Sequence, residues 1–123
     1  MDLMPHCFVK VKLHLFTREE GGRENGIGNG YRADHALSDD GVLSIGPMYF
    51  SDKNKGTMNT GENSDMSVVF ILTENSKSKI LKLQKGDKWK IFEGKRCVGE
   101  CEMIERLSTD EEIEKQGTFT SEF

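Results

Sequence analysis

A segment near the end of the chain, residues 86–107, places the strongest constraint on the fold. Within it, residues 88–91 alternate lysine with tryptophan or isoleucine, which is the period of a strand with one buried and one wet face. Gly94 follows in a short polar turn, where glycine adopts a positive φ at little cost. In residues 97–103 the side chains again alternate between two faces, as in a strand. The segment therefore predicts a half-buried β-hairpin.

Further strands are expected earlier in the chain. The clearest covers residues 7–16, where apolar side chains alternate with lysines and a histidine, although Phe8 falls on the polar face. Residues 66–73 are apolar on both faces, which indicates a strand deep in the core or partly covered from outside. Weaker strands are predicted at 31–37, 42–45 and 48–50, loops at 17–29 and 51–64, and a segment at 80–83 leading into the turn before the hairpin.

Length and composition agree with an all-β domain. A chain of 123 residues most simply forms one domain, which buries a core without a metal or a disulfide. Thirteen glycines against two prolines, with 35% hydrophobic residues, are typical of a protein of strands and turns and not of a disordered chain.

Residues 108–123 form an acidic tail of different character. Ser108 with Glu111, or Thr109 with Glu112, fits a capping box and predicts a short helix over residues 110–115 that ends near Gly117. Because so short a helix is marginal by itself, we expect the tail to be loosely held. Residues 105–123 hold six acidic and two basic residues, which leaves residues 1–104 formally neutral. The body of the protein is therefore not the strongly basic surface that would announce nucleic-acid binding.

Two short blocks carry a resemblance to a known family. The first has six residues between its two halves, and the second is the hairpin. The blocks are Glu19-Glu20-Gly21-Gly22-Arg23 with Gly30-Tyr31-Arg32, and Trp89-x-Ile91-x-Glu93-Gly94-x-Arg96-x-Val98-Gly99. Both resemble, in the same order and at a similar separation, the C-terminal β-barrel domain (domain III) of elongation factor Tu.

The resemblance covers residues 7–107 and implies a fold. It implies a closed six-stranded antiparallel β-barrel of the translation-factor type. Residues 1–6 would then be an N-terminal lead, and residues 108–123 an acidic tail or short helix. This length leaves no room for a GTPase domain, so we expect no GTP binding by this chain.

The resemblance also implies contact residues. In elongation factor Tu this barrel helps to hold the T stem of aminoacyl-tRNA, and the matching positions here are Arg32, Glu93, Gly94 and Arg96. Residues 77–96 carry eight basic and two acidic residues, a stripe that would neutralise phosphates and give salt-dependent binding. The expected RNA or partner contacts are therefore Arg23, Arg32, Lys88, Lys90, Glu93, Gly94, Lys95 and Arg96.

Two alternatives weigh against RNA as the ligand. The lysines also suit an ordinary wet outer face that discourages edge pairing. The family's Pro-Gln after Gly-Tyr-Arg is Ala33-Asp34 here, which puts a carboxylate where a neutral group would meet RNA. The family's aromatic segment is replaced by residues 24–28, as expected where a surface that packed on a neighbouring domain now faces water. We therefore expect a non-catalytic module that binds a protein partner, for example one of the translation machinery, with weak tRNA or RNA binding as the alternative.

No pattern for catalysis, a cofactor or a metal emerges. His6, His14 and His35 are scattered, and no Walker A sequence is present. Residues 26–30 are glycine-rich, but no helical pattern opens after them, so a phosphate loop is not expected. Aspartates near residues 34–40 could bind a metal, yet turn chemistry explains them equally well. We expect neither an enzyme nor a cofactor.

Cysteine use and the N-terminus predict a cytoplasmic protein. Cys7, Cys97 and Cys101 are odd in number, and the last two would lie roughly 13 Å apart along one strand, too far for a disulfide. Small buried hydrophobes in a reducing cytosol explain all three. Residues 1–5 lack the apolar core of a signal peptide, and no run is long enough to span a bilayer, so no membrane contact is expected.

Overall fold

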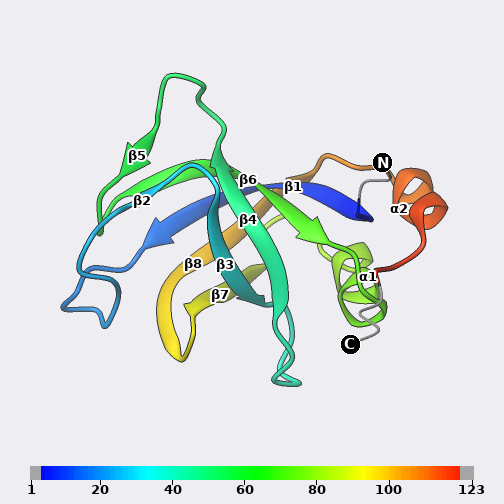
Figure 1. Ribbon diagram of the computed structural model, residues 1–123, viewed down its shortest axis with the longest axis horizontal. Coiled ribbons are helices and arrows are strands. Elements are labelled where there is room, and N and C mark those ends of the chain that lie inside the picture. The colour runs from blue at the N-terminus through cyan, green and yellow to red at the C-terminus, as the bar shows by residue number, and fades with distance from the viewer. Residues whose placement is uncertain (1–3, 120–123) are drawn as a thin grey trace.

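Six strands close into an antiparallel barrel in the order β1-β6-β4-β3-β7-β8 (Figure 1). The computed structural model describes residues 4–119. The barrel strands are β1 (His6–Leu15), β3 (Tyr31–Ala36), β4 (Ser44–Phe50), β6 (Asn63–Ile71), β7 (Lys88–Glu93) and β8 (Arg96–Arg106). This arrangement confirms the all-β, closed six-stranded antiparallel barrel expected from the sequence.

The strand β1 shows how the sequence pattern builds the core. Its inward apolar side chains are fully buried inside the barrel, whereas its lysines and Phe8 lie on the outside. On β6, Met66, Val68 and Phe70 are buried, whereas Val69 and Ile71 remain half-buried on the outer face. The strand is therefore partly covered from outside, one of the two arrangements that its composition predicted.

The three cysteines are free. Cys7 and Cys101 are buried in the barrel core and Cys97 is half-buried. Burial raises the pKa of the Cys7 and Cys101 thiols, so both stay protonated and pack as small apolar side chains.

Both predicted long loops carry a short strand, which the sequence analysis did not anticipate. The strands β2 (Ile27–Gly28) and β5 (Thr57–Met58) pair with each other outside the barrel. They fasten the β1–β3 connection to the β4–β6 connection. Ile27 and Met58 are buried, so the ribbon also extends the core.

Two helices lie close together at one end of the barrel (Figure 1), and the first of them corrects the sequence analysis. The helix α1 (Glu74–Leu81) occupies a segment where no helix was expected. Its N-cap Thr73 accepts a hydrogen bond from the Ser76 amide, while the Ser76 hydroxyl accepts one from the Thr73 amide at 2.8 Å. A serine thus completes the capping box in place of the usual glutamate or glutamine, so the pattern escapes a search for those residues.

The second helix, α2 (Asp110–Gln116), confirms the helix expected in the tail, with Gly117 at its C-terminal end. For residues 108–119, the part of the tail that the structure describes, the expectation of a loosely held segment is wrong. Ile113 is fully buried, and the Gln116 side chain bonds both backbone groups of His6, at 2.9 and 2.8 Å. The Phe119 amide donates to the Leu72 carbonyl at 2.7 Å, so the tail returns to the end of β6.

Candidate binding surfaces

The two resemblance blocks meet in one cluster at the turn end of the β7–β8 hairpin. Arg23 forms an ion pair with Glu93, and the Tyr31 hydroxyl donates to Glu93 Oε1 at 3.0 Å. The Arg23 guanidinium carbon also lies 5.1 Å from the centre of the Tyr31 ring. Burial and the Glu93 carboxylate raise the pKa of Tyr31 to about 12, so its hydroxyl stays a donor. Gly94 makes the turn beside the cluster with φ of 60°.

This cluster changes the interpretation of two predicted contact residues. Arg23 and Glu93 satisfy each other, and they join the β1–β3 connection to the hairpin. Their position therefore fits a structural clamp at least as well as a contact with a ligand. The sequence could indicate that both residues matter, but not that they face each other across 70 positions.

A double-mutant cycle will measure this clamp. Arg23→Ala and Glu93→Ala are each expected to lower the free energy of unfolding, with a coupling of about 1 kcal/mol, because Arg23 is only 24% exposed. The Arg18–Glu24 pair in the same connection provides the control, since its side chains are 79% and 73% exposed and a coupling below about 0.5 kcal/mol is expected. Equal couplings in denaturant titrations would refute the clamp.

Half of the eight basic side chains in the predicted stripe are ion-paired, and β8 supplies the carboxylates for the two on β7. Lys90 Nζ lies 2.7 Å from Glu100, and Lys88 Nζ lies 3.7 Å from Glu102, as the antiparallel register directs. The hydrogen bond between Lys90 and Glu100 raises the pKa of the lysine and lowers that of the carboxylate. Elsewhere in the stripe, Lys77 pairs with Glu114 and Lys79 with Asp40. Within residues 4–119, the basic side chains of the stripe that form no ion pair are Lys82, Lys85, Lys95 and Arg96.

Arg32 faces a different part of the surface. It lies on β3 opposite Pro47 of β4, and the residues that share its cavity come from β4, β6 and the terminal segments, not from β7. The structure therefore joins Arg23 with Glu93 and places Lys95 and Arg96 at the hairpin turn, but it gives Arg32 separate neighbours.

The sequence analysis missed an apolar surface on the outside of the barrel, here called the apolar face. It crosses the neighbouring strands β1, β6 and β4, and Phe8 lies opposite Val69 in the strand register. Phe8 is 40% exposed and Tyr49 is 44% exposed, and both line one open hollow with Val69. The apolar face consists of Phe8, Ile45, Pro47, Tyr49, Val69 and Ile71. A signal was present, because Phe8 sits at a polar position of its strand and residues 66–73 are apolar on both faces.

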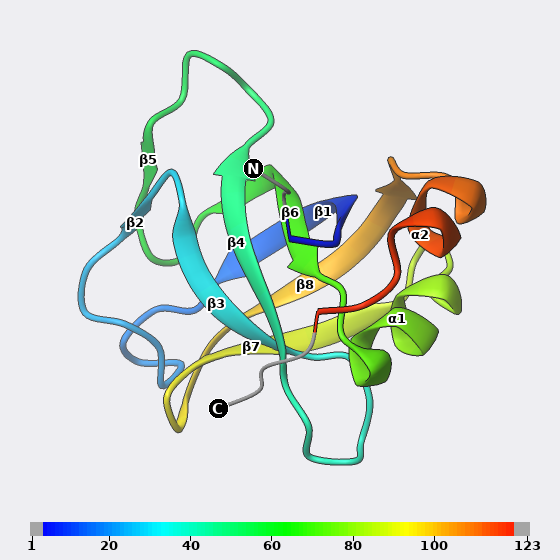
Figure 2. The same ribbon diagram turned by 45° about the vertical axis from the view of Figure 1, so that its right-hand side comes forward.

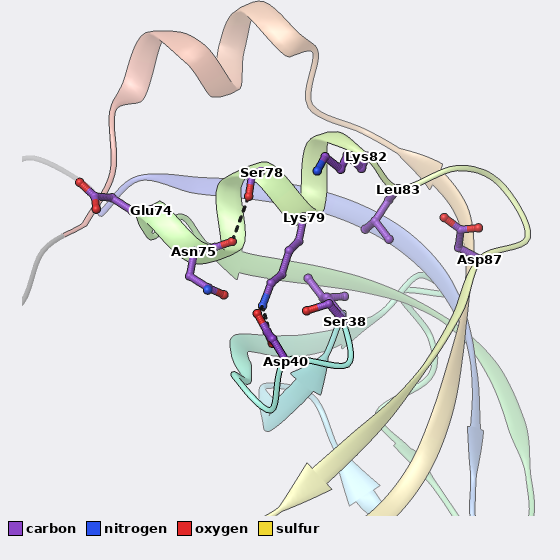
Figure 3. A pocket seen from close by; sticks show the side chains of 10 residues that line it. Ser38, Asp40, Glu74, Asn75, Ser78, Lys79, Lys82, Leu83 and Asp87 are labelled. Carbon is purple, nitrogen blue, oxygen red and sulfur yellow. Dashed lines mark hydrogen bonds and ion pairs between the residues drawn. The ribbon is translucent and has the colours of Figure 1, made fainter.

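A polar hollow of about 710 Å³ lies between α1 and the β3–β4 connection (Figure 3). Figure 3 shows Lys79 reaching from α1 to Asp40, with 2.8 Å between its Nζ and the carboxylate. The hydrogen bond from Lys79, aided by the Val42 amide, holds the pKa of Asp40 well below its usual range. Asp40 therefore forms a salt bridge with Lys79, and this role is an alternative to the metal-ligand role considered from the sequence.

His35 is fully buried in the core between β3, β4 and β7. Its Nε2 donates to the Gly46 carbonyl at 2.9 Å, and its Nδ1 accepts from Trp89 Nε1 at 2.9 Å. Burial lowers the pKa of His35 to about 4, so the ring is neutral at physiological pH. With both ring nitrogens occupied, His35 has no free position for a metal or a substrate proton.

Metal and membrane sites were also sought in the described part of the chain. Among residues 4–119, no group of three histidine, cysteine, aspartate or glutamate side chains converges as metal ligands. No helix in the same range combines the length and apolar character needed to cross a membrane.

Comparison with known protein families and with curated protein sequences finds no match to this chain. The barrel and its surfaces therefore stand as the basis for a functional proposal.

Proposed function

We propose that this chain is a non-catalytic binding module that contacts a protein partner through the apolar face. The observation that carries the proposal is the continuity of apolar side chains across the outside of three strands, with Phe8, Ile45 and Tyr49 exposed and the others half-buried. Contiguous apolar patches on a soluble domain mark interaction sites, and aromatic side chains such as Phe8 and Tyr49 are enriched in the central contacts of interfaces.

RNA binding is the second candidate, and one observation favours it. Lys95 and Arg96 are exposed at the hairpin turn and form no ion pair within residues 4–119. The corresponding hairpin of elongation factor Tu contacts tRNA, which is the resemblance noted from the sequence. Against this, Lys88 and Lys90 already have carboxylate partners, and phosphates would have to displace them. We therefore rank a protein partner first.

The cellular setting follows the same reasoning. A relative of domain III of elongation factor Tu would act in the cytoplasm and could meet the translation machinery there. The three unpaired cysteines suit that reducing compartment. A barrel with the buried histidine and ion-paired carboxylates described above supports binding and not catalysis, GTP hydrolysis included.

Retention assays with surface variants will separate the two candidates. The paired change Phe8→Ser with Tyr49→Ser is expected to abolish nuclease-resistant retention of a partner from cytosol, because it removes the centre of the apolar face. Val42→Ser is the matched control, since Val42 is 44% exposed but lies in the β3–β4 connection outside that face. Retention that survives the double change would refute the proposed surface.

The RNA alternative has its own readout. Filter binding of bulk tRNA should be salt-sensitive and lost in the variant Lys88→Glu, Lys90→Glu, Arg96→Glu if RNA is the ligand. Under the protein-partner proposal, the same triple change leaves partner retention intact. Loss of retention in this triple variant but not in the apolar-face variant would reverse the ranking.

A further inference from the structure

Next to the apolar face lies a second cavity, of about 540 Å³. This volume is within the range of small-molecule sites, roughly 300–1,000 Å³. The cavity sits between the outer faces of β3, β4 and β6 and the N-terminal end of α1. Its lining residues come from parts of the chain that are far apart in sequence: Met4, Arg32, Leu43, Ser44, Ile45, Pro47, Ile71, Thr73, Ser76 and Phe119. Most of its surface is apolar, and only a few polar groups converge on it.

Ser44 is the first of these polar groups. It is 3% exposed, and its hydroxyl has no hydrogen-bond partner within the described residues. Ser44 borders the cavity, but its hydroxyl oxygen is closed off from solvent, and its side chain lies on the buried side of β4 with Gly46 and Met48. A molecule in the cavity therefore does not reach this hydroxyl, and polar recognition there depends on Arg32.

Arg32 is the second polar group, and it sets the charge of the cavity. Arg32 is exposed, it is the one charged side chain among the described residues of the lining, and it forms no salt bridge with any carboxylate of residues 4–119. A guanidinium presents a planar fork of donors that fits a carboxylate. An apolar cavity with one unpaired arginine is therefore complementary to an apolar molecule that carries one negative charge.

Both ends of the described chain help to enclose the space. Met4 lines it from the N-terminal side, and Phe119 lines it from the tail, whose amide is bonded to the Leu72 carbonyl at 2.7 Å. Figure 2 shows the tail running from α2 past α1 toward β4. With these segments in place the cavity is bounded on several sides, which suits a small molecule better than a polypeptide lying across the barrel.

We infer that this cavity binds a small carboxylic acid with an apolar body. The carboxylate pairs with Arg32, while the apolar body lies against Ile45, Ile71 and Phe119. This ligand site shares Ile45, Pro47 and Ile71 with the apolar face, whereas the contact with a protein partner depends on Phe8 and Tyr49, which do not line the cavity.

Octanoate and its neutral analogue 1-octanol will test the site in the full chain. Amide resonances are followed by two-dimensional NMR during titration. Octanoate is expected to give saturable shifts at Ser44, Ile71 and Thr73, and 1-octanol to bind about tenfold more weakly, because it lacks the charge that pairs with Arg32. Saturable shifts confined to Phe8 and Tyr49, or the absence of saturable shifts, would overturn the inference.

Two substitutions assign the polar contacts. Arg32→Gln should weaken octanoate about tenfold and leave 1-octanol unchanged, while Ser44→Ala should leave both unchanged, because its hydroxyl does not reach the cavity. Arg18→Gln is the control, because this substitution removes the same charge from the β1–β3 connection, outside the cavity. Equal losses in Arg32→Gln and Arg18→Gln would show general charge attraction and overturn the site. The NMR spectra also report whether each variant is folded.

Discussion

Replacing His35 with leucine is expected to lower the free energy of unfolding by about 3 kcal/mol at neutral pH, and by much less in acid. At neutral pH the leucine leaves two buried groups without partners, the Trp89 indole N–H and the Gly46 carbonyl, and each costs roughly 1–3 kcal/mol. The imidazole also packs edge-on against Phe70, with 4.8 Å between ring centres, and leucine loses that contact.

Acid reduces this difference because it destabilises the native protein through the same histidine. The pKa of His35 is about 4 in the folded state, below its ordinary value of 6.5, so the unfolded state binds the proton more readily. Stability is therefore complete above about pH 6.5 and falls as the pH drops toward 4. The loss amounts to roughly 3 kcal/mol at 1.36 kcal/mol for each pKa unit. The leucine variant has no histidine at this position and so lacks this loss of stability in acid.

The measurement is urea unfolding followed by circular dichroism at neutral pH and at about pH 4. Trp89→Phe serves as the control, because it removes the indole N–H donor but keeps the histidine, and so it should retain the acid sensitivity. A cost of His35→Leu that is the same at both pH values would show that the ring does not lose its proton on folding, contrary to its burial.

The barrel could be predicted because its strands obey simple periodicity. On β1 the apolar side chains alternate with lysines, and the structure buries each of them except Phe8, which lies on the outer face. The hairpin of β7 and β8 was expected from residues 86–107 for the same reason, and Gly94 takes the positive φ that its turn needs. Local patterns of this kind require no knowledge of distant parts of the chain.

The elements that escaped prediction depend on less common local signals or on distant contacts. The capping box of α1 has a serine, Ser76, at its third helical position, where a glutamate or glutamine is usual. Only one apolar residue of the helix, Ile80, is fully buried, so its helical pattern is weak. The docking of the tail depends on Gln116 reaching the backbone of His6, 110 positions away. No periodicity in residues 108–123 encodes such a contact.

The candidate binding surfaces were also predictable only in part, because local patterns mark single residues but not their contacts in the fold. The sequence identified Arg23 and Glu93 as important, but their contact with each other appears only in the fold. It identified lysines on β7, but the carboxylates opposite them come from the register of β8. The apolar face was hidden for a physical reason, because an outward apolar residue on a strand resembles a core residue until the strands are assembled.

Gly99→Ala is expected to have the other large effect, a loss of about 3 kcal/mol in the free energy of unfolding. Gly99 lies on β8 opposite Leu15 of β1. A Cβ atom there would come within 2.6 Å of the His14 carbonyl oxygen and 3.3 Å of Leu13 Cδ1. The first of these is a backbone atom, so β1 and β8 must separate to make room, and their hydrogen bonds weaken.

Gly56→Ala is the matched control, because a Cβ at Gly56 would meet no atom within 4 Å and the residue has no positive φ. Its expected effect is within about 0.5 kcal/mol. Equal stability of the two variants in denaturant titrations would show that the β1–β8 pair can open without cost. A large loss for Gly99→Ala alone would mean that this glycine of the second resemblance block is required for strand approach. Together with the Arg23–Glu93 clamp, that result would assign the most recognisable residues of the chain to building the barrel. Partner recognition would then depend on the apolar side chains that no motif marks.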